Sequence, residues 1–365
     1  MRYKEHWEDT QKRFEAWWKG TNTGRPLMKI VAKRKEPVEA LETVEPHADA
    51  ESFHLNVEKN IRLYRNYCRS HSFMAEAFPN FSIDLGPGSM ALYLGAEPEF
   101  SWDTLWFKEC IHEWDEKWRN LSFDQQNRWW VKHQEMARQA RDLAGGDFPI
   151  AIPDIIENLD ILLVMRGTEN LCYDLMDEAG IIKEGVSQID DLYFKYYDTL
   201  YDMLKFKDGS SVYTCFQIWG QGKTAKVQCD FSAMMSPGQY REFALESLKK
   251  QCARLDNSLY HLDGPDAIKH VDAIMEIKDL KALQWTCGAG QPDGGSQQWY
   301  PIYEKVRAAG KSLWIQFYDG GFEDWVKGAE KLVRTFGSQG MYMLFPDMEE
   351  EEAVRLINIA EERWS

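Results

Sequence analysis

The feature of this sequence that most constrains its fold is the alternation of β-strand and α-helix patterns through the carboxy-terminal half. Short apolar or β-branched segments predict strands, and amphipathic segments predict helices between most of them. The predicted strands cover residues 211–219, 226–230, 259–263, 282–286, 312–318 and 340–345. Alternation of this kind implies a parallel sheet.

The amino-terminal half adds predicted strands at residues 27–32, 81–84 and 148–154, a first helix through Lys19 and a mostly helical stretch over residues 103–143. Around eight strands in this length favour a closed (β/α)8 TIM barrel. The glycine fingerprint of an open, doubly wound sheet is absent. With no linker or internal repeat, the prediction is one α/β domain over residues 1–365, a barrel with an N-terminal helical extension.

Charge and cysteine content narrow the class of protein. The net charge of -16 argues against nucleic acid or an anionic membrane as a partner, because both need a basic surface. Seven cysteines without a CxxC pair are typical of reduced thiols. The polar first residues do not resemble a signal peptide, and the longest apolar run, residues 161–165, is too short to span a bilayer. The sequence therefore predicts a cytoplasmic protein.

In a barrel, chemistry collects at the carboxyl ends of the strands. The segment 259–264 predicts a strand that ends with His261 and Asp263, which at i and i+2 project to the same side. Asp230 ends a neighbouring predicted strand. Asp263 could hold the His261 imidazole in one tautomer and make it a general base, or Asp263 and Asp230 could form two interacting carboxylates with one proton between them. These three residues are the predicted catalytic group.

Further candidates at or near strand ends are predicted to bind a substrate. Trp and Tyr side chains there could form flat walls against a sugar-like or aromatic ring, or could simply close the core. A lone cysteine such as Cys287 could be a nucleophile, although an inert small residue is the more frequent role. The candidates for substrate binding are Asp84, Trp219, Gln228, Trp285, Cys287, Gln316 and Tyr318.

Residues 229–243 form a distinctive block in which Asp230 precedes the Ser236–Pro237 helix start, and the segments 15–20, 24–26 and 159–167 accompany it. In these residues the sequence resembles the uroporphyrinogen decarboxylase superfamily. Ser236, Pro237 and Gln239 also have the spacing of a capping box with proline at the first helical position. The resemblance covers most of the chain and implies a (β/α)8 barrel, in agreement with the alternation of strands and helices.

The superfamily contains metal-free decarboxylases and methyltransferases that work with corrinoid or thiol acceptors. The resemblance implies that the methyltransferases carry His-x-Cys-Gly at the strand matching His261 and a later cysteine, which together bind zinc. Here the segment reads His261-Leu262-Asp263-Gly264, and residues 340–345 contain no cysteine. Because both thiolates are missing, no metal ligand is assigned, and a site made by His261, Asp263 and Cys287 is the alternative.

Three functions follow from this resemblance and from the residues themselves. The first is a methyltransferase or demethylase that acts on a small methylated or methoxylated substrate, with a corrinoid protein as acceptor. The second is a metal-free lyase or decarboxylase that uses His/Asp acid–base chemistry on a polar ring such as a sugar derivative. The third is a barrel that binds a ligand without turnover. We favour the first because that branch is populous and varied; its candidate partners are a small-molecule substrate, a corrinoid protein and a second copy of the chain in a homodimer. The sequence does not specify a cofactor.

Overall fold

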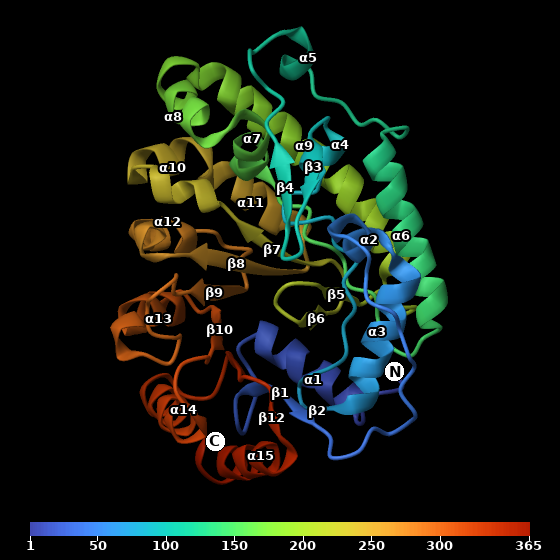
Figure 1. Cartoon of the computed structure of the whole chain (residues 1–365). Coiled ribbons are helices and arrows are strands. Elements are labelled where there is room, and N and C mark those ends of the chain that lie inside the picture. The colour runs from blue at the N-terminus through green and yellow to red at the C-terminus, as the bar shows by residue number, and fades with distance from the viewer.

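The computed structural model describes residues 1–365 and is built around a mostly parallel sheet of eight strands (Figure 1). The strands follow the order β12-β1-β11-β10-β9-β8-β7, and β2 pairs antiparallel with β1. The other pairings in the sheet are parallel. The bounds are β1 (Leu27–Lys33), β2 (His71–Ala75), β7 (Thr224–Gln228), β8 (Asn257–Asp263), β9 (Ala282–Thr286), β10 (Ser312–Gln316), β11 (Met341–Leu344) and β12 (Met348–Glu349).

The sheet is consistent with an α/β barrel, but its hydrogen-bonded ladder does not close as the sequence predicts. Beyond β7, the predicted strands at 81–84 and 148–154 are reduced to isolated parallel bridges, Phe81 to Ile150 and Ile152 to Tyr213. Prolines explain part of this difference, because Pro149 and Pro153 have no N–H to donate to a ladder.

Three predicted elements are divided differently in the structure. Residues 211–219 form not one strand but an antiparallel hairpin of β5 (Ser211–Tyr213) and β6 (Ile218–Gly220), reversed by a turn in which Gln217 has a φ of 49°. The extended segment 226–230 ends at Gln228, and Asp230 instead begins a short 3-10 helix (Asp230–Met234). The stretch 103–143, predicted as mostly helical, contains the strand β4 (Leu105–Lys108), which pairs with β3 (Glu97–Phe100), before its main helix begins.

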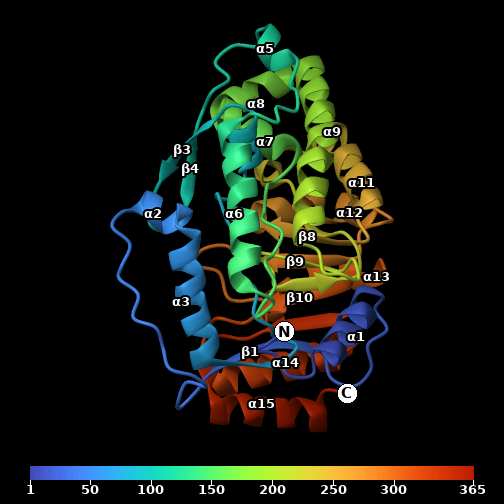
Figure 2. The same cartoon turned by 90° about the vertical axis from the view of Figure 1, so that its right-hand side faces the viewer.

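The helices cover the sheet from outside. Figure 1 shows α8, α10, α12, α13, α14 and α15 following one another along one side, and Figure 2 shows α3, α6 and α9 side by side on another. No helix has the combination of length and apolar composition needed to cross a membrane. The helices are α1 (Trp7–Trp18), α2 (Ala50–Leu55), α3 (Val57–Ser70), α4 (Met90–Tyr93), α5 (Glu116–Arg119), α6 (Arg128–Ala144), α7 (Asn158–Arg166), α8 (Thr168–Asp177), α9 (Ala179–Leu204), α10 (Pro237–Phe243), α11 (Leu245–Arg254), α12 (Val271–Met275), α13 (Tyr300–Ala308), α14 (Phe322–Phe336) and α15 (Glu350–Arg363).

Helix α10 begins as its sequence predicts. The Ser236 hydroxyl accepts a hydrogen bond from the Gln239 backbone N–H, the Gln239 side chain returns to the Ser236 backbone, and Pro237 occupies the first helical position. This capping box satisfies backbone donors that the first turn of a helix leaves free. It places the start of α10 directly after the 3-10 helix that carries Asp230.

Helix α1 covers the amino-terminal ends of the strands. Its Trp17 is fully buried, and the Trp17 Nε1–H donates to the backbone oxygen of Leu313 at 3.3 Å, at the start of β10. The Trp18 Nε1–H donates to the backbone oxygen of Trp219 on β6 at 2.8 Å. One end of the sheet is therefore filled by aromatic side chains, and the carboxyl ends of the strands remain for a site.

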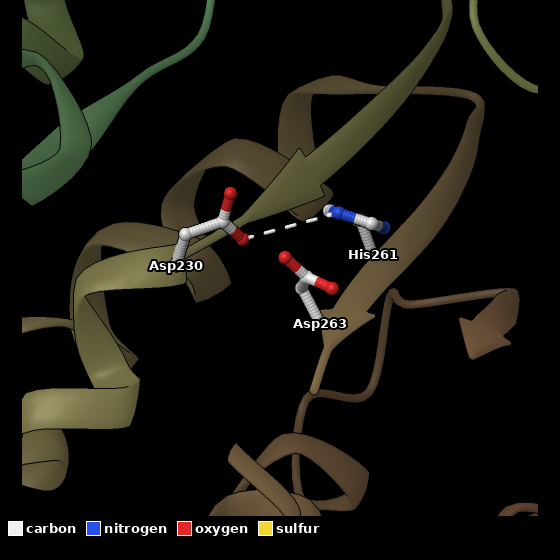
Figure 3. A group of neighbouring side chains, drawn as sticks. All are labelled: Asp230, His261 and Asp263. Carbon is white, nitrogen blue, oxygen red and sulfur yellow. Dashed lines mark ion pairs between the residues drawn. The ribbon is translucent and has the colours of Figure 1, made fainter. Parts of the chain in front are cut away.

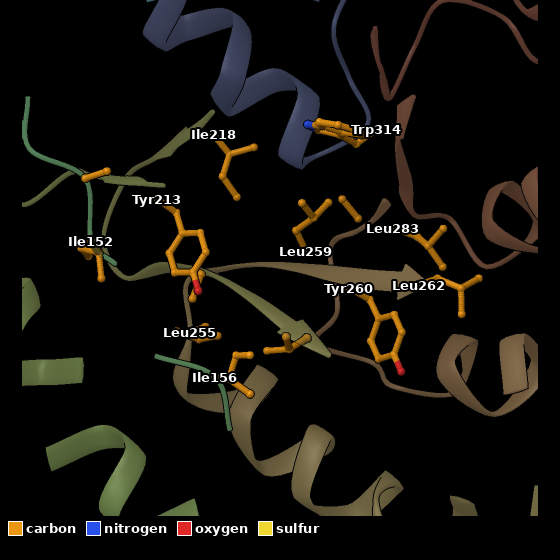
Figure 4. Close-up of a cluster of buried hydrophobic side chains, with 14 of the residues drawn as sticks. Ile152, Ile156, Tyr213, Ile218, Leu255, Leu259, Tyr260, Leu262, Leu283 and Trp314 are labelled. Atoms are coloured by element: carbon orange, nitrogen blue, oxygen red, sulfur yellow. The ribbon is translucent and has the colours of Figure 1, made fainter. Parts of the chain in front are cut away.

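Strand β8 shows how the core and the site share one element (Figure 4). Tyr260 and Leu262 are buried, and the Tyr260 hydroxyl lies 3.1 Å from the hydroxyl of Tyr240 on α10. His261 and Asp263 alternate with them along the strand and so project to the opposite side. The apolar half of the alternation anchors β8 against the outer helices, and the polar half points away from them.

Candidate active site

Asp230, His261 and Asp263 converge at the carboxyl ends of β7 and β8 (Figure 3). One oxygen or nitrogen atom from each residue lies within 4.8 Å of those of the other two. His261 and Asp263 share β8, and Asp230 is the first residue of the 3-10 helix that follows β7. The structure therefore brings together the three residues that the sequence predicts as the catalytic group.

His261 is held in one orientation by the next strand. Its Nδ1 is hydrogen-bonded to the Gln284 side-chain oxygen on β9, and the Gln284 Nε2 donates to the Thr286 hydroxyl at 2.8 Å. Burial lowers the pKa of His261, and the Lys226 ammonium lowers it further, against the opposing effects of the Gln284 hydrogen bond and the Asp263 carboxylate. The ring is thus neutral near pH 7, with its proton on Nδ1 and a free electron pair on Nε2.

Asp230 is held in position by a buried carboxylate on α7. Asp160 on α7 accepts hydrogen bonds from the backbone N–H groups of Asp230 at 2.8 Å and of Phe231 at 3.0 Å. The Asp230 Oδ2 accepts from the Gln228 side chain at 2.9 Å, whereas its Oδ1 is buried without a hydrogen-bond partner. Burial, followed by the neighbouring charge of Asp160, raises the pKa of Asp230 to about 8. The Asp230 Oδ1 lies 4.0 Å from the His261 Nε2.

A buried polar network lies behind these residues. The Lys226 ammonium is 2.7 Å from the Asp154 carboxylate and donates to Gln228. Burial works to raise the pKa of Asp154, but Lys226 outweighs it and holds that pKa below its usual value. Glu157 accepts a hydrogen bond from the Gln228 backbone N–H at 2.6 Å, and burial raises its pKa well above the ordinary range. Gln228, predicted to touch substrate, is 3% exposed and serves to connect this network to Asp230.

Several residues of this network were not among the predicted site residues. Lys226, Gln228 and Asp230 alternate at i, i+2 and i+4, so a lysine within an otherwise buried strand could have indicated a polar interior face. Asp160 and Glu157 lie near the start of α7, far from β7 in sequence, and Gln284 lies in the middle of an apolar strand. Only the packing of α7 and β9 against β7 and β8 reveals their roles.

A cavity of about 830 Å³ opens beside Asp263, at the carboxyl ends of β9 and β10. Trp285, Cys287, Gln316 and Tyr318, four of the predicted substrate-binding residues, line it together with the loop 288–292. Tyr318 is half exposed, whereas Trp285 is buried and its Nε1 has no hydrogen-bond partner. Burial raises the pKa of Cys287 to about 11, so its side chain is a thiol rather than a nucleophilic thiolate near neutral pH.

Besides Gln228, two predicted substrate-binding residues lie outside this cavity. Trp219 is 1% exposed and packs edge-on against Trp7 of α1, at the opposite ends of the strands, because the hairpin reverses the chain before β6. Asp84 lies near Asp154 and Lys226, and burial followed by the Asp154 charge raises its pKa to about 7. Its Oδ1 is buried without a partner. Asp84 thus belongs to the surroundings of the buried network rather than to the cavity wall.

Comparison with known proteins gives information on the fold. No family model matches the chain, and no curated protein sequence matches it. Among solved structures, the chain is similar to a methyltransferase from Methanosarcina mazei, with a TM-score of 0.62 and 11% sequence identity. The match covers 98% of this chain and 99% of that one. The two chains therefore share their overall architecture from end to end.

Proposed function

We propose that the protein is a methyltransferase that removes a methyl group from a small methylated or methoxylated molecule, with a corrinoid protein as the acceptor. The convergence of His261, Asp230 and Asp263 beside a cavity of small-molecule size carries this proposal. The end-to-end likeness in fold to a methyltransferase supports it.

The chemistry of demethylation explains why such residues are useful. The bond between the methyl carbon and the substrate oxygen breaks, the methyl carbon forms a bond with the electron pair of the acceptor, and the oxygen keeps the pair of the broken bond. The oxygen gains negative charge, so a proton donor or a cation placed against it lowers the barrier, and Asp230, whose pKa is raised to about 8, can be a proton donor. Asp263 lines the cavity and His261 and Asp230 lie next to it, which is where that oxygen would have to bind.

The cavity walls suit a flat or ring-shaped substrate. Tyr318 offers an exposed aromatic face, and Trp285 adds a second, mostly buried aromatic ring to the same wall. An aromatic wall can fix the orientation of a small ring while the methylated atom faces Asp263. Productive orientation is itself a large part of catalysis.

Transfer of a methyl group to free, reduced cobalamin tests the proposal directly. Purified protein is incubated with a panel of O-methylated and N-methylated small molecules, and methylated cobalamin is followed by its absorbance. We expect at least one donor to react, and His261→Ala to lower the rate by about 100-fold or more. A matched substitution of Trp219 by Phe, at the opposite ends of the strands, should leave the rate within about twofold. Failure of every donor, or full activity of His261→Ala, would overturn the proposal.

A metal-free lyase or decarboxylase is the second candidate, favoured by one specific observation. The His261 Nε2 is free to accept a proton, and a carboxyl group, Asp230, lies 4.0 Å from it, so a base and an acid are available without any methyl acceptor. Release of CO2 or an elimination product from carboxylated sugar derivatives by chelator-treated protein would support this function. Binding without turnover in both assays would instead indicate a ligand-binding barrel.

A further inference from the structure

The three converging side chains can each offer an electron pair to one shared ligand when Asp230 is ionised. Asp230 and Asp263 contribute carboxylates, and His261 contributes the electron pair on Nε2, because its Nδ1 is engaged by Gln284. The Asp230 Oδ1 is buried and unpartnered, and at 4.0 Å the His261 Nε2 is too distant to form a hydrogen bond with it. A single cation between them could accept an electron pair from all three groups at once.

We infer that Asp230, His261 and Asp263 bind one divalent cation. Ligand bonds of about 2.0–2.2 Å place neighbouring ligand atoms on one ion roughly 3–4 Å apart. The three atoms already lie within 4.8 Å of one another, so small side-chain rotations bring them to this spacing. The two carboxylates also balance the charge of a divalent ion.

The surroundings of His261 are those of a metal ligand. Metal-binding histidines usually donate their second ring N–H to an oxygen that fixes the ring and its tautomer. Gln284 provides that oxygen, and Thr286 holds the Gln284 amide in the required orientation. The Asp160 carboxylate fixes the position of Asp230 in a similar way, by accepting a hydrogen bond from the Asp230 backbone N–H. The ligand side chains are therefore oriented by neighbours that do not bind the ion themselves.

The ligand set selects the class of ion. One imidazole and two carboxylates suit a first-row ion such as Mn²⁺, Fe²⁺ or Zn²⁺, whereas Mg²⁺ and Ca²⁺ prefer oxygen ligands alone. No cysteine sulfur belongs to the group. Because Asp263 also lines the cavity, the ion would have open positions facing it. There it would act as a Lewis acid on the substrate oxygen, a role that rests on the proposed function, whereas binding of the ion does not.

Titration of chelator-treated, full-length protein with Mn²⁺ tests the inference. Binding is measured by calorimetry and by the electron paramagnetic resonance signal of the free ion. We expect one ion per chain, displaced by Zn²⁺ and not by an equal concentration of Mg²⁺. His261→Ala and Asp263→Asn should each weaken Mn²⁺ binding by about 100-fold or more. Gln284→Leu, which removes only the orienting oxygen, should weaken it by about 10–100-fold.

Asp319→Asn is the matched control, because Asp319 is a carboxylate in the same cavity but outside the group of three. Its Mn²⁺ affinity should equal that of the wild type, and circular dichroism verifies that each variant is folded. Absence of stoichiometric binding, or binding that survives both His261→Ala and Asp263→Asn, would overturn the inference. Methyl transfer by metal-stripped protein would remove the Lewis-acid role and leave the proposed function standing. A bound ion without methyl transfer from any donor would overturn the proposed function and leave the metal site standing.

Discussion

Replacing Lys226 by Met should destabilise the protein strongly, because Lys226 neutralises a carboxylate inside the sheet. The side chains of Lys226 and Asp154 are 1% and 5% exposed, and their charged atoms lie 2.7 Å apart. Removing one partner of such a buried pair leaves the other charge without compensation, at a cost of roughly 3–5 kcal/mol. With about 2.1 cal/mol/K of unfolding entropy for each of the 365 residues, this loss lowers Tm by about 4–6 °C.

The stability lost in Lys226→Met should also depend on pH, and the shifts in the pKa values of Asp154 and Lys226 determine in which direction. The folded pKa of Asp154 is depressed, so its contribution to stability is present above its unfolded pKa and is lost as the pH falls. The folded pKa of Lys226 is raised, so its contribution is complete below its unfolded pKa. The pair therefore stabilises the fold between about pH 4 and pH 10. In Lys226→Met, burial acts on Asp154 without the Lys226 charge and is opposed mainly by the hydrogen bonds from Tyr213 and Cys215. Asp154 should therefore take up a proton more readily as the pH falls and recover part of the stability.

Urea unfolding of Lys226→Met, Asp154→Asn and the double variant at pH 5 and pH 7.5 measures these effects. We expect the double variant to be more stable at pH 7.5 than the sum of the two single losses predicts, since neither charge is then left alone. In Asp154→Asn, the new side-chain oxygen can still accept the hydrogen bond that the Tyr213 hydroxyl donates at 2.8 Å. A loss below about 1 kcal/mol for Lys226→Met at pH 7.5, or strictly additive variants, would refute the reasoning.

Three further predictions concern other parts of the chain. Glu157 has a raised folded pKa, so its contribution to stability is largest at low pH and falls as the pH rises. Glu157→Gln should therefore gain stability relative to the wild type between about pH 5 and pH 9. A difference in unfolding free energy between the two proteins that stays constant over this pH range in urea unfolding would contradict this. Trp219→Ala should lower the unfolding free energy by about 3–5 kcal/mol while Mn²⁺ affinity stays unchanged, because the side chain packs on α1 away from the site; a large change in affinity on titration would place it in the site after all. Glu76→Gln should cost about 2–3 kcal/mol in thermal unfolding, because buried Glu76 accepts charged hydrogen bonds from Arg13 at 2.6 Å and Arg25 at 2.8 Å; an unchanged Tm would show that these bonds contribute nothing.

The location of the candidate site could be predicted from the sequence because it depends on short-range geometry. A strand places residues i and i+2 on one side whatever surrounds it, so His261 and Asp263 were expected to project together. The rule that parallel strands bring their carboxyl ends to one edge then added Asp230. The same reasoning put four of the substrate candidates, Trp285, Cys287, Gln316 and Tyr318, near one another, and all four line the cavity.

Two kinds of strand prediction failed, one because a turn was not visible in the composition and the other because the segment found little pairing. Residues 211–219 are β-branched and aromatic without glycine or proline, so nothing in the segment indicates the reversal at Gln217 that carries Trp219 to the far ends of the strands. Conversely, segments 81–84 and 148–154 have the composition of strands but form only single bridges. Composition indicates that a segment favours an extended backbone. Whether it joins a sheet depends also on a neighbouring segment with N–H and C=O groups free to pair with it.

By itself, the sequence determined the alternation of strands and helices, the capping box that starts α10, and the side of β8 on which His261 and Asp263 lie. Each of these follows from contacts within a few residues of the chain. Only the tertiary structure decided that Asp160 orients Asp230, that Lys226 is neutralised by Asp154, and that Gln284 leaves the His261 Nε2 free. The partners in those pairs lie between 23 and 72 residues apart, so their contact depends on how the strands and α7 pack, and that packing sets the protonation and orientation of the site.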